Sequence, residues 1–324
     1  MKQKILITGC AGFIGFHVAK YFCTKGYDII GVDNINSYYS QSLKKTRLDI
    51  LLNKKNFTFL KNDISNTDFL NSLFDNNSIK FVLHFAAQAG VRFSIENPKI
   101  YIDTNIGGFL NILQECKKHG INLFYASSSS VYGDNINSIL NEKLKTDSQV
   151  SIYGVTKKTN ELMAKTYFNS FNVNSIGLRF FTVYGPLGRP DMAYYKFTKK
   201  IINNENIEVY NKGNHYRSFT YIDDVVESVY LLYKKFQKSK KFNDIYNIGS
   251  SKSESLNFFI KTIEKKLNKQ ANIKYLSKQN GDVKNTASDS SKLNKLISFT
   301  PKIDIKEGLN KFIDWYLKYY NKSL

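Results

Sequence analysis

A tyrosine and a lysine one helical turn apart are the strongest candidates for acid–base chemistry in this sequence. The segment Tyr153-Gly154-Val155-Thr156-Lys157 places a phenol four residues before an ammonium group. Residues i and i+4 share one face of a helix, so Lys157 would lie beside the Tyr153 hydroxyl. A neighbouring positive charge lowers the pKa of a phenol toward the range in which it can take up a proton. The pair therefore predicts a general base.

The position of this pair distinguishes it from other pairs with the same spacing. Tyrosine precedes lysine by four residues at three further places: Tyr21/Lys25, Tyr195/Lys199 and Tyr230/Lys234. Only Tyr153 opens a predicted helix that follows a strand ending in Ala126 and a run of four serines, 127–130. In open α/β sheets, ligands bind at the carboxyl ends of the strands. A serine hydroxyl at such an end can bridge a substrate hydroxyl and the phenolate.

A glycine-rich turn near the N-terminus predicts a dinucleotide site. Gly9, Gly12 and Gly15 are spaced as GxxGxxG in the segment TGCAGFIG, between a predicted strand and a predicted helix. Glycines in this setting let the backbone approach a pyrophosphate, which is held at the N-terminus of the helix. The pattern alone is weak, but its place between a strand and a helix makes it strong.

Residues after the next strands complete the predicted cofactor site. Asp33 ends the second strand, where a carboxylate can accept hydrogen bonds from both ribose hydroxyls and repel a 2′-phosphate, which favours NAD over NADP. Asp63 is a candidate for the adenine edge, and Asn105 is either a cofactor contact or an ordinary polar helix residue. Small side chains at Ala86 and Ala87 would let the cofactor lie against backbone. The remaining members of the predicted site are Phe13, Ile14, Asn34, Ile64 and Phe85.

The elements that must position these residues alternate between strands and helices. The predicted strands are Lys4–Thr8, Asp28–Val32, Phe57–Lys61, Lys80–Phe85, Asn122–Ala126, Ser175–Phe180 and, later, Ile245–Ile248. The predicted helices are Phe13–Lys25, Thr67–Phe74, Pro98–His119, Ser151–Asn169 and Asp223–Phe236. Helical crossovers between successive strands predict an α/β fold, a Rossmann-type doubly wound parallel sheet.

The alternation ends near residue 180, which predicts a second region. We expect an NAD-binding Rossmann domain over residues 1–180, to which residues 220–249 return. A smaller, partly interleaved C-terminal substrate-binding region is expected over residues 181–219 and 250–324.

The composition limits the classes of protein to which this chain can belong. The chain has 324 residues, a net charge of +20, 42% hydrophobic residues and a mean hydropathy of −0.36, which are typical of a soluble globular protein. The basic residues are scattered lysines rather than clusters interleaved with aromatics, so no nucleic-acid partner is expected. No apolar run is long enough for a membrane span, no signal peptide is recognisable, and three cysteines without metal-ligand spacing favour free thiols in the cytoplasm. The four histidines, His17, His84, His119 and His215, form no metal pattern, so no metal is expected.

Longer strings in the chain resemble one enzyme family. TGCAGFIG, the strand end at Asp33, HFAAQAGVRFSIENP, SSSSVYG and YGVTK together resemble the extended short-chain dehydrogenase/reductases that act on nucleotide sugars. AAQAGVRFSIENP, RFFTVYGPLGRPDMA and FTYIDDVVE are similar to UDP-glucuronate 4-epimerases, and the resemblance continues through GDVKNTASD to EGLNKFIDWY.

The resemblance implies a catalytic set and a reaction. Ser128 would orient the sugar hydroxyl, Tyr153 would be the base, and Lys157 would assist it and hold the nicotinamide ribose. UDP-glucuronate decarboxylases usually carry Glu where this chain has Ser130, and 4,6-dehydratases usually carry Asp-Glu at the positions of Ser129 and Ser130. The serines therefore favour 4-epimerisation of UDP-glucuronate to UDP-galacturonate through a 4-keto sugar. Epimerisation of UDP-glucose or UDP-N-acetylglucosamine remains an alternative, decarboxylation of UDP-glucuronate a weaker one, and a non-catalytic binding protein a third.

The substrate contacts follow from the same resemblance. A 4-keto uronic acid loses carbon dioxide easily, so the site must hold its carboxylate away from the reactive geometry. Ser129, Ser130 and Thr182 are expected to bind that carboxylate with Arg189 nearby, while Arg217 and Arg92 are expected at the diphosphate. Ser218 departs from the Asp usual in the family, and no role follows for Arg47 or Arg179. The family also implies a homodimer paired through the helices at 98–119 and 151–169.

Overall fold

The computed structural model describes residues 4–134, 139–213, 216–277 and 285–322. The chain divides into two compact units that interleave along the sequence. The first comprises residues 1–133, 142–180 and 226–247, and the second comprises residues 134–141, 181–225 and 248–324.

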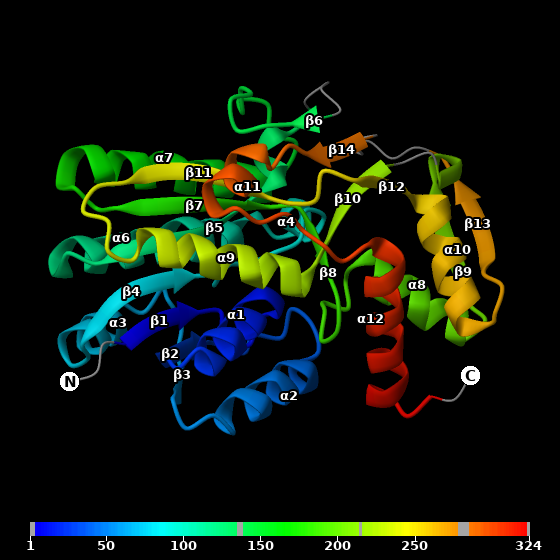
Figure 1. The fold of residues 1–324 in the computed structure, drawn as a ribbon, viewed down its shortest axis with the longest axis horizontal. Coiled ribbons are helices and arrows are strands. Elements are labelled where there is room, and N and C mark those ends of the chain that lie inside the picture. Colours follow the sequence, from blue (N-terminus) through cyan, green and yellow to red (C-terminus); the bar gives the residue numbers. More distant parts are fainter. Residues whose placement is uncertain (1–3, 135–138, 214–215, 278–284, 323–324) are drawn as a thin grey trace. The chain divides into compact units, whose positions relative to one another are not determined.

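A seven-stranded sheet forms the centre of the first unit (Figure 1). Its strands are β1 (Lys4–Thr8), β2 (Asp28–Asp33), β3 (Phe57–Lys61), β4 (Ile79–His84), β5 (Asn122–Ser128), β7 (Ser175–Phe180) and β11 (Asn243–Ile248). The order is β11-β7-β5-β4-β1-β2-β3, and the pairs from β3 to β7 are parallel. The strand order reverses between β1 and β4, where such sheets bind their ligands. The predicted Rossmann-type doubly wound sheet is confirmed.

Helices cover both faces of this sheet. They are α1 (Phe13–Thr24), α2 (Gln41–Leu52), α3 (Thr67–Asp75), α4 (Phe93–Glu96), α5 (Pro98–Tyr101), α6 (Gly108–His119), α7 (Ile152–Phe171) and α9 (Ile222–Phe236). On one face, Leu6 and Val82 share a core with apolar residues of α3, α6 and α7. On the other face, Phe81 of β4 packs edge-on against Tyr233 of α9, which also meets Phe22 of α1. This alternation of buried side chains is expected of strands covered on both sides.

One predicted helix is wrong in detail. The stretch expected as a single helix from Pro98 to His119 runs as α5, a π-helical turn η1 (Ile102–Gly107), and α6. A π turn widens the backbone and rotates the side chains that follow, which hydrophobic spacing does not reveal. Asn105 lies within this π turn and is buried. Helix α2 was also not expected from the sequence.

The second unit contains shorter elements. Its strands are β6 (Ile139–Leu140), β8 (Thr182–Tyr184), β9 (Asn206–Tyr210), β10 (Tyr216–Tyr221), β12 (Ser253–Ser255), β13 (Asn272–Leu276) and β14 (Asn285–Ser288). Its helices are α8 (Ala193–Ile202), the 3-10 turn η3 (Asn211–Gly213), α10 (Leu256–Leu267), α11 (Ser291–Ile297) and α12 (Ile305–Tyr319). Strands β12, β10, β14 and β6 lie side by side, β8 pairs with β10, and β9 pairs with β13. Within the described ranges, no helix has the length and apolar character needed to cross a membrane.

Candidate active site

Helix α7 carries the predicted base and its lysine. Ser151 caps the helix by accepting a hydrogen bond from the Gly154 backbone N–H at 3.1 Å, so the first turn that bears Tyr153 is well defined. Lys157 follows one turn later, is 2% exposed, and donates from Nζ to the Ala126 carbonyl of β5 at 2.8 Å. Burial lowers the pKa of Lys157 to about 7. The lysine is therefore placed at the end of β5, next to the serine run.

Ser128 ends strand β5 at the start of a tight turn. The 3-10 turn η2 (Ser129–Tyr132) follows it, and the Ser128 Oγ accepts a hydrogen bond from the Ser130 backbone N–H at 3.1 Å. A side chain at Gly154 would come within 2.7 Å of the Ser130 carbonyl oxygen, so η2 packs directly on the first turn of α7. Ser128 and the Tyr153–Lys157 turn consequently lie at one edge of the sheet.

Two of the three competing tyrosine–lysine pairs have other partners. The Tyr21 hydroxyl donates to the Glu227 carboxylate, and Lys25 lies over the Tyr21 ring, 4.8 Å from its centroid. The Tyr195 hydroxyl lies 2.5 Å from the Tyr320 hydroxyl within the second unit. Burial, reinforced by these neighbours, raises the pKa of both phenols above the usual range. A raised pKa disfavours the phenolate, so neither suits a general base.

The glycine turn joins β1 to α1 as the sequence predicts. Gly9 has a φ of +72°, and a Cβ there would meet the Ala86 backbone nitrogen at 2.6 Å. A Cβ at Gly15 would lie 2.2 Å from the Gly9 carbonyl oxygen. Gly12 begins α1, and no side chain caps this helix among the described residues. The turn thus presents open backbone at a helix N-terminus, the usual environment for a phosphate group.

Two carboxylates follow β2 and β3. Asp33 accepts from the Ala11 backbone N–H at 3.0 Å and from the Ile35 N–H at 2.8 Å, which fixes its orientation beside the glycine turn. Asn34 donates to Asp63 at 2.6 Å and so links the two strand ends. Partial burial raises the pKa of Asp63, but hydrogen bonds from the Ser65 backbone and hydroxyl and from Asn34 outweigh it, and the pKa lies below its usual value. The carboxylate is held charged.

The turn after β4 is held by a residue that lies on η1. The Asn105 side chain accepts from the Gln88 N–H at 2.7 Å and donates to the Gln88 carbonyl at 3.0 Å. It also contacts the Thr156 Oγ1 at 3.1 Å, and the Asn160 amide of α7 donates to its carbonyl at 2.6 Å. Asn105 therefore ties the turn after β4 to the catalytic helix, and its side chain is occupied within the protein.

Sequence reasoning missed two buried groups that support the glycine turn. Arg47 of α2 is fully buried and donates from Nη1 to the Ala11 carbonyl at 2.8 Å and to the Tyr39 hydroxyl at 2.7 Å. His84 of β4 lies 2.8 Å from the Thr8 hydroxyl, and burial, with a smaller effect of Lys157, lowers its pKa to about 3. The scarcity of arginine in a lysine-rich chain was the available signal for Arg47.

The chain is similar to known proteins over most of its length. A profile of the NAD dependent epimerase/dehydratase family matches residues 5–249. Protein CapI of Staphylococcus aureus is 49% identical over 99% of this chain and all of its own length. UDP-glucuronate 4-epimerase of Thermodesulfobacterium geofontis is 40% identical over 96% of this chain and 95% of its own.

A solved structure is also similar over nearly the whole chain. The UDP-glucuronic acid 4-epimerase of Bacillus cereus, in complex with UDP-glucuronic acid and NAD, has a TM-score of 0.91 and 32% identity, covering 98% of this chain and all of that chain. The chain belongs to the NAD dependent epimerase/dehydratase family.

The first unit of this family member fits NAD on its own geometry. The open helix N-terminus at Gly12 suits the pyrophosphate, and the fixed carboxylate of Asp33 suits a ribose diol. Phe85 donates its N–H to the Thr8 carbonyl at 3.1 Å, which brings Ala86 and Ala87 alongside the glycine turn. The side chains of Phe13 and Ile64 are buried, so these two would contribute through their backbone.

The predicted substrate residues are distributed over both units. In the first unit, Ser129 and Ser130 are half-buried in η2, whereas Arg92 is exposed at the start of α4. In the second unit, Thr182 of β8 pairs with Phe219 of β10, the strand that also carries Arg217.

Two side chains of the second unit have partners of their own. The guanidinium of Arg189 binds Asp191 through two nitrogens, with the Nε bond at 3.0 Å, a pairing that the sequence did not suggest. Ser218 is buried and donates to the Ser250 carbonyl at 2.5 Å, so its hydroxyl forms a contact within this unit. His215 lies outside the described residues.

Proposed function

We propose that this enzyme epimerises C4 of UDP-glucuronate to give UDP-galacturonate, with NAD as a resident cofactor. The observation that carries the proposal is the placement of Lys157. Lys157 follows Tyr153 by one turn of α7. Its buried Nζ donates to the carbonyl of Ala126, which lies two residues before Ser128 in β5. This contact supports a site in which Tyr153 is the base, Lys157 its charged assistant and Ser128 the hydroxyl partner, at the strand end where ligands of this fold bind.

The residues of this chain handle the proton. Tyr153, as phenolate, accepts the proton of the sugar C4 hydroxyl, and the Ser128 hydroxyl orients that group. The ammonium group of Lys157 stabilises the phenolate, and Ser130 keeps Ser128 in place through its N–H. Bound NAD would supply reversible hydride transfer at C4. When the 4-keto sugar turns its other face, Tyr153 gives the proton back, and the C4 configuration is inverted.

The uronate carboxylate must be restrained while C4 is a ketone. Ser129 and Ser130 of η2 are the candidates in the first unit, and Thr182, with Arg189 nearby, is the candidate in the second. Arg217 and Arg92 are candidates for the diphosphate, because a guanidinium can bind phosphate oxygens with two parallel hydrogen bonds. We assign residues 181–219 and 250–324 to substrate binding on the same basis.

The products formed from UDP-glucuronate without added NAD test the proposal. UDP-galacturonate should form until the two epimers reach equilibrium, and Tyr153→Phe should keep its bound NAD while losing turnover. Faster conversion of UDP-glucose or UDP-N-acetylglucosamine would assign the enzyme to those sugars. A pentose as the main product would make it a decarboxylase, and the absence of any turnover would favour a binding protein.

We also propose that two copies pair through α6 and α7. These helices pack against each other, and they expose apolar side chains at Leu110, Val155 and Leu162, while the preceding turn η1 exposes Ile102. A two-fold axis would cover this patch with the same patch of a second copy, which a closed dimer requires. The three cysteines are free and buried, in accord with a cytoplasmic enzyme.

Sedimentation of a charged variant tests the dimer. Leu162 on α7 is 58% exposed, and Leu162→Glu should give a monomer. Leu52 on α2 is 54% exposed, so Leu52→Glu adds the same charge away from the patch and should leave the dimer intact. A wild-type protein that sediments as a monomer, or a dimer that survives Leu162→Glu, would contradict the pairing.

A further inference from the structure

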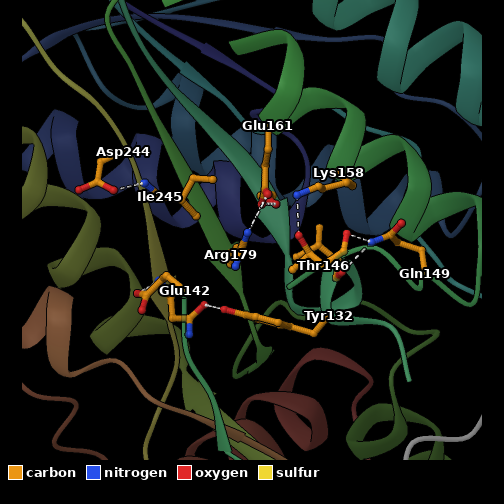
Figure 2. A network of polar contacts seen from close by, with 12 residues as sticks. Tyr132, Glu142, Thr146, Gln149, Lys158, Glu161, Arg179, Asp244 and Ile245 are labelled. Atoms are coloured by element: carbon orange, nitrogen blue, oxygen red, sulfur yellow. Dashed lines mark hydrogen bonds and ion pairs between the residues drawn. The ribbon is translucent and has the colours of Figure 1, made fainter. Parts of the chain in front are cut away.

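A buried arginine on the neighbouring strand β7 lies beside the end of β5, the strand that carries Ser128. Arg179 of β7 is the register neighbour of Ser127 of β5, so the two side chains share the sheet face that α7 covers. Figure 2 shows Glu161 reaching from α7 to Arg179. The guanidinium donates from Nε to Oε1 and from Nη2 to Oε2 of Glu161, both at 2.8 Å. Both side chains are nearly inaccessible, at 3% and 2% exposed.

The same arginine contacts segments on both sides of Ser128. On the strand side, Ser127 donates from Oγ to Glu161 Oε1 at 2.6 Å. On the turn side, Arg179 Cζ lies 4.8 Å from the centroid of the Tyr132 ring, the last residue of η2. Tyr132 is in turn anchored through its hydroxyl, which donates to Asn247 Oδ1 at 2.7 Å. We call Ser127, Tyr132, Glu161 and Arg179 the arginine cluster.

The arginine cluster also sets the position of the catalytic helix. Glu161 follows Lys157 by one turn on α7, and these two residues bind successive residues of β5. Lys157 holds the Ala126 carbonyl and Glu161 holds the Ser127 hydroxyl. Two contacts one turn apart determine both the translation and the rotation of α7 along β5. None of the contacts described above reaches the Ser128 side chain, so the cluster acts on it through the backbone.

Stability alone does not account for this arrangement. Two charges removed from water carry a large desolvation penalty, and apolar residues of similar size often replace a buried ion pair without loss of stability. Arg179 Nη1 is also buried without a hydrogen-bond partner among the described residues, which adds to the cost. A planar fork nevertheless gives a fixed geometry that packing of flexible apolar chains does not.

We propose that Glu161 and Arg179 are positioning residues for the epimerisation, which set the spacing between Ser128 and the Tyr153–Lys157 turn. The inference rests on the proposed function. Neither residue touches substrate; both act through the backbone of β5, η2 and α7. A displacement of the base by a fraction of an ångström from the reacting hydroxyl slows the chemical step while leaving binding of the sugar nucleotide largely unchanged.

Steady-state kinetics of Glu161→Gln and Arg179→Lys test the inference. The first variant keeps the size of the side chain and removes its charge, and the second keeps the charge and loses the fork. Each should lower kcat for UDP-glucuronate about 10- to 100-fold, with KM and bound NAD within about 3-fold of the wild type. Ser127→Ala, which removes one hydroxyl, should lower kcat only a few-fold with little change in the thermal midpoint, so it keeps the test valid if the charge variants do not fold.

Leu113→Ala provides the matched control for lost stability. Leu113 of α6 is fully buried in the core of the same unit and lies outside the arginine cluster. This variant should lower the thermal midpoint and leave kcat unchanged below it. The inference is overturned if Glu161→Gln and Arg179→Lys lose no more kcat than Leu113→Ala, or if their loss appears in KM or bound NAD. Failure of the wild type to convert UDP-glucuronate would instead refute the proposed function.

Discussion

Replacing Lys157 by methionine should remove activity and yet stabilise the cofactor-free protein at neutral pH. Burial lowers the pKa of Lys157 from 10.5 to about 7, which is worth about 5 kcal/mol at 1.4 kcal/mol per pKa unit. Because this pKa is depressed, the unfolded chain binds the extra proton between pH 7 and 10.5, and the free energy of unfolding rises across that range. At pH 7 the folded protein therefore carries nearly the whole penalty, and methionine removes it.

The lost hydrogen bond to the Ala126 carbonyl offsets part of this gain. A charged hydrogen bond contributes about 1.5–3 kcal/mol, so Lys157→Met should raise the free energy of unfolding by about 2–3 kcal/mol at pH 7. The gain should disappear by about pH 10, where the wild-type lysine is neutral in the folded protein and the pH is close to its pKa of 10.5 in the unfolded chain, so that little of the penalty remains. Urea unfolding of NAD-free protein at the two pH values measures the difference.

Lys165→Met controls for the loss of a lysine from the same helix, because Lys165 is exposed on α7. It should change neither the stability difference between the two pH values nor turnover. The reasoning from desolvation is wrong if Lys157→Met is no more stable than the wild type at pH 7 and if the difference in free energy of unfolding between the two proteins is the same at pH 10.

Three further outcomes are expected. Burial, with a smaller effect of Lys157, lowers the pKa of His84 to about 3, so the protein should lose stability as the pH falls below 6.5. His84→Gln lacks this titration, so its free energy of unfolding relative to the wild type, measured in urea, should rise by about 3 kcal/mol between pH 7 and pH 4. Gly15→Ala places a Cβ 2.2 Å from the Gly9 carbonyl oxygen, so it should cost about 1–3 kcal/mol of stability and abolish NAD binding measured by titration; retained affinity would show that the turn can relax. Ser130→Ala should raise the share of pentose in the products of UDP-glucuronate, and an unchanged product ratio by chromatography would remove Ser130 from carboxylate binding.

Local pattern predicted much of the first unit. The strands Lys4–Thr8, Phe57–Lys61 and Ser175–Phe180 have the bounds expected from their apolar runs and flanking turns. The helix bearing Tyr153 begins at Ile152, one residue after the expected start, because Ser151 serves as its cap. These features depend on residues close together in the chain, which a sequence displays directly.

The strands of the second unit and their pairing could not be predicted from local pattern. Its strands are short, and several pair with segments distant in the chain, such as β6 with β14 and β9 with β13. A strand of two or three residues, such as β6, β8 or β12, has too few positions for an alternation to stand out, and its existence depends on the neighbour that completes its hydrogen bonds.

The sequence by itself determined the Rossmann-type sheet and the glycine turn, and it predicted Ser128, Tyr153 and Lys157 as the catalytic set. Residue types, local spacing and family resemblance supported these inferences, because each motif lies within a single turn or strand end. Only the tertiary structure decided what surrounds them. Arg179 meets Glu161, and Arg47 meets the Ala11 carbonyl, because strand register and helix packing bring together groups that no local spacing relates.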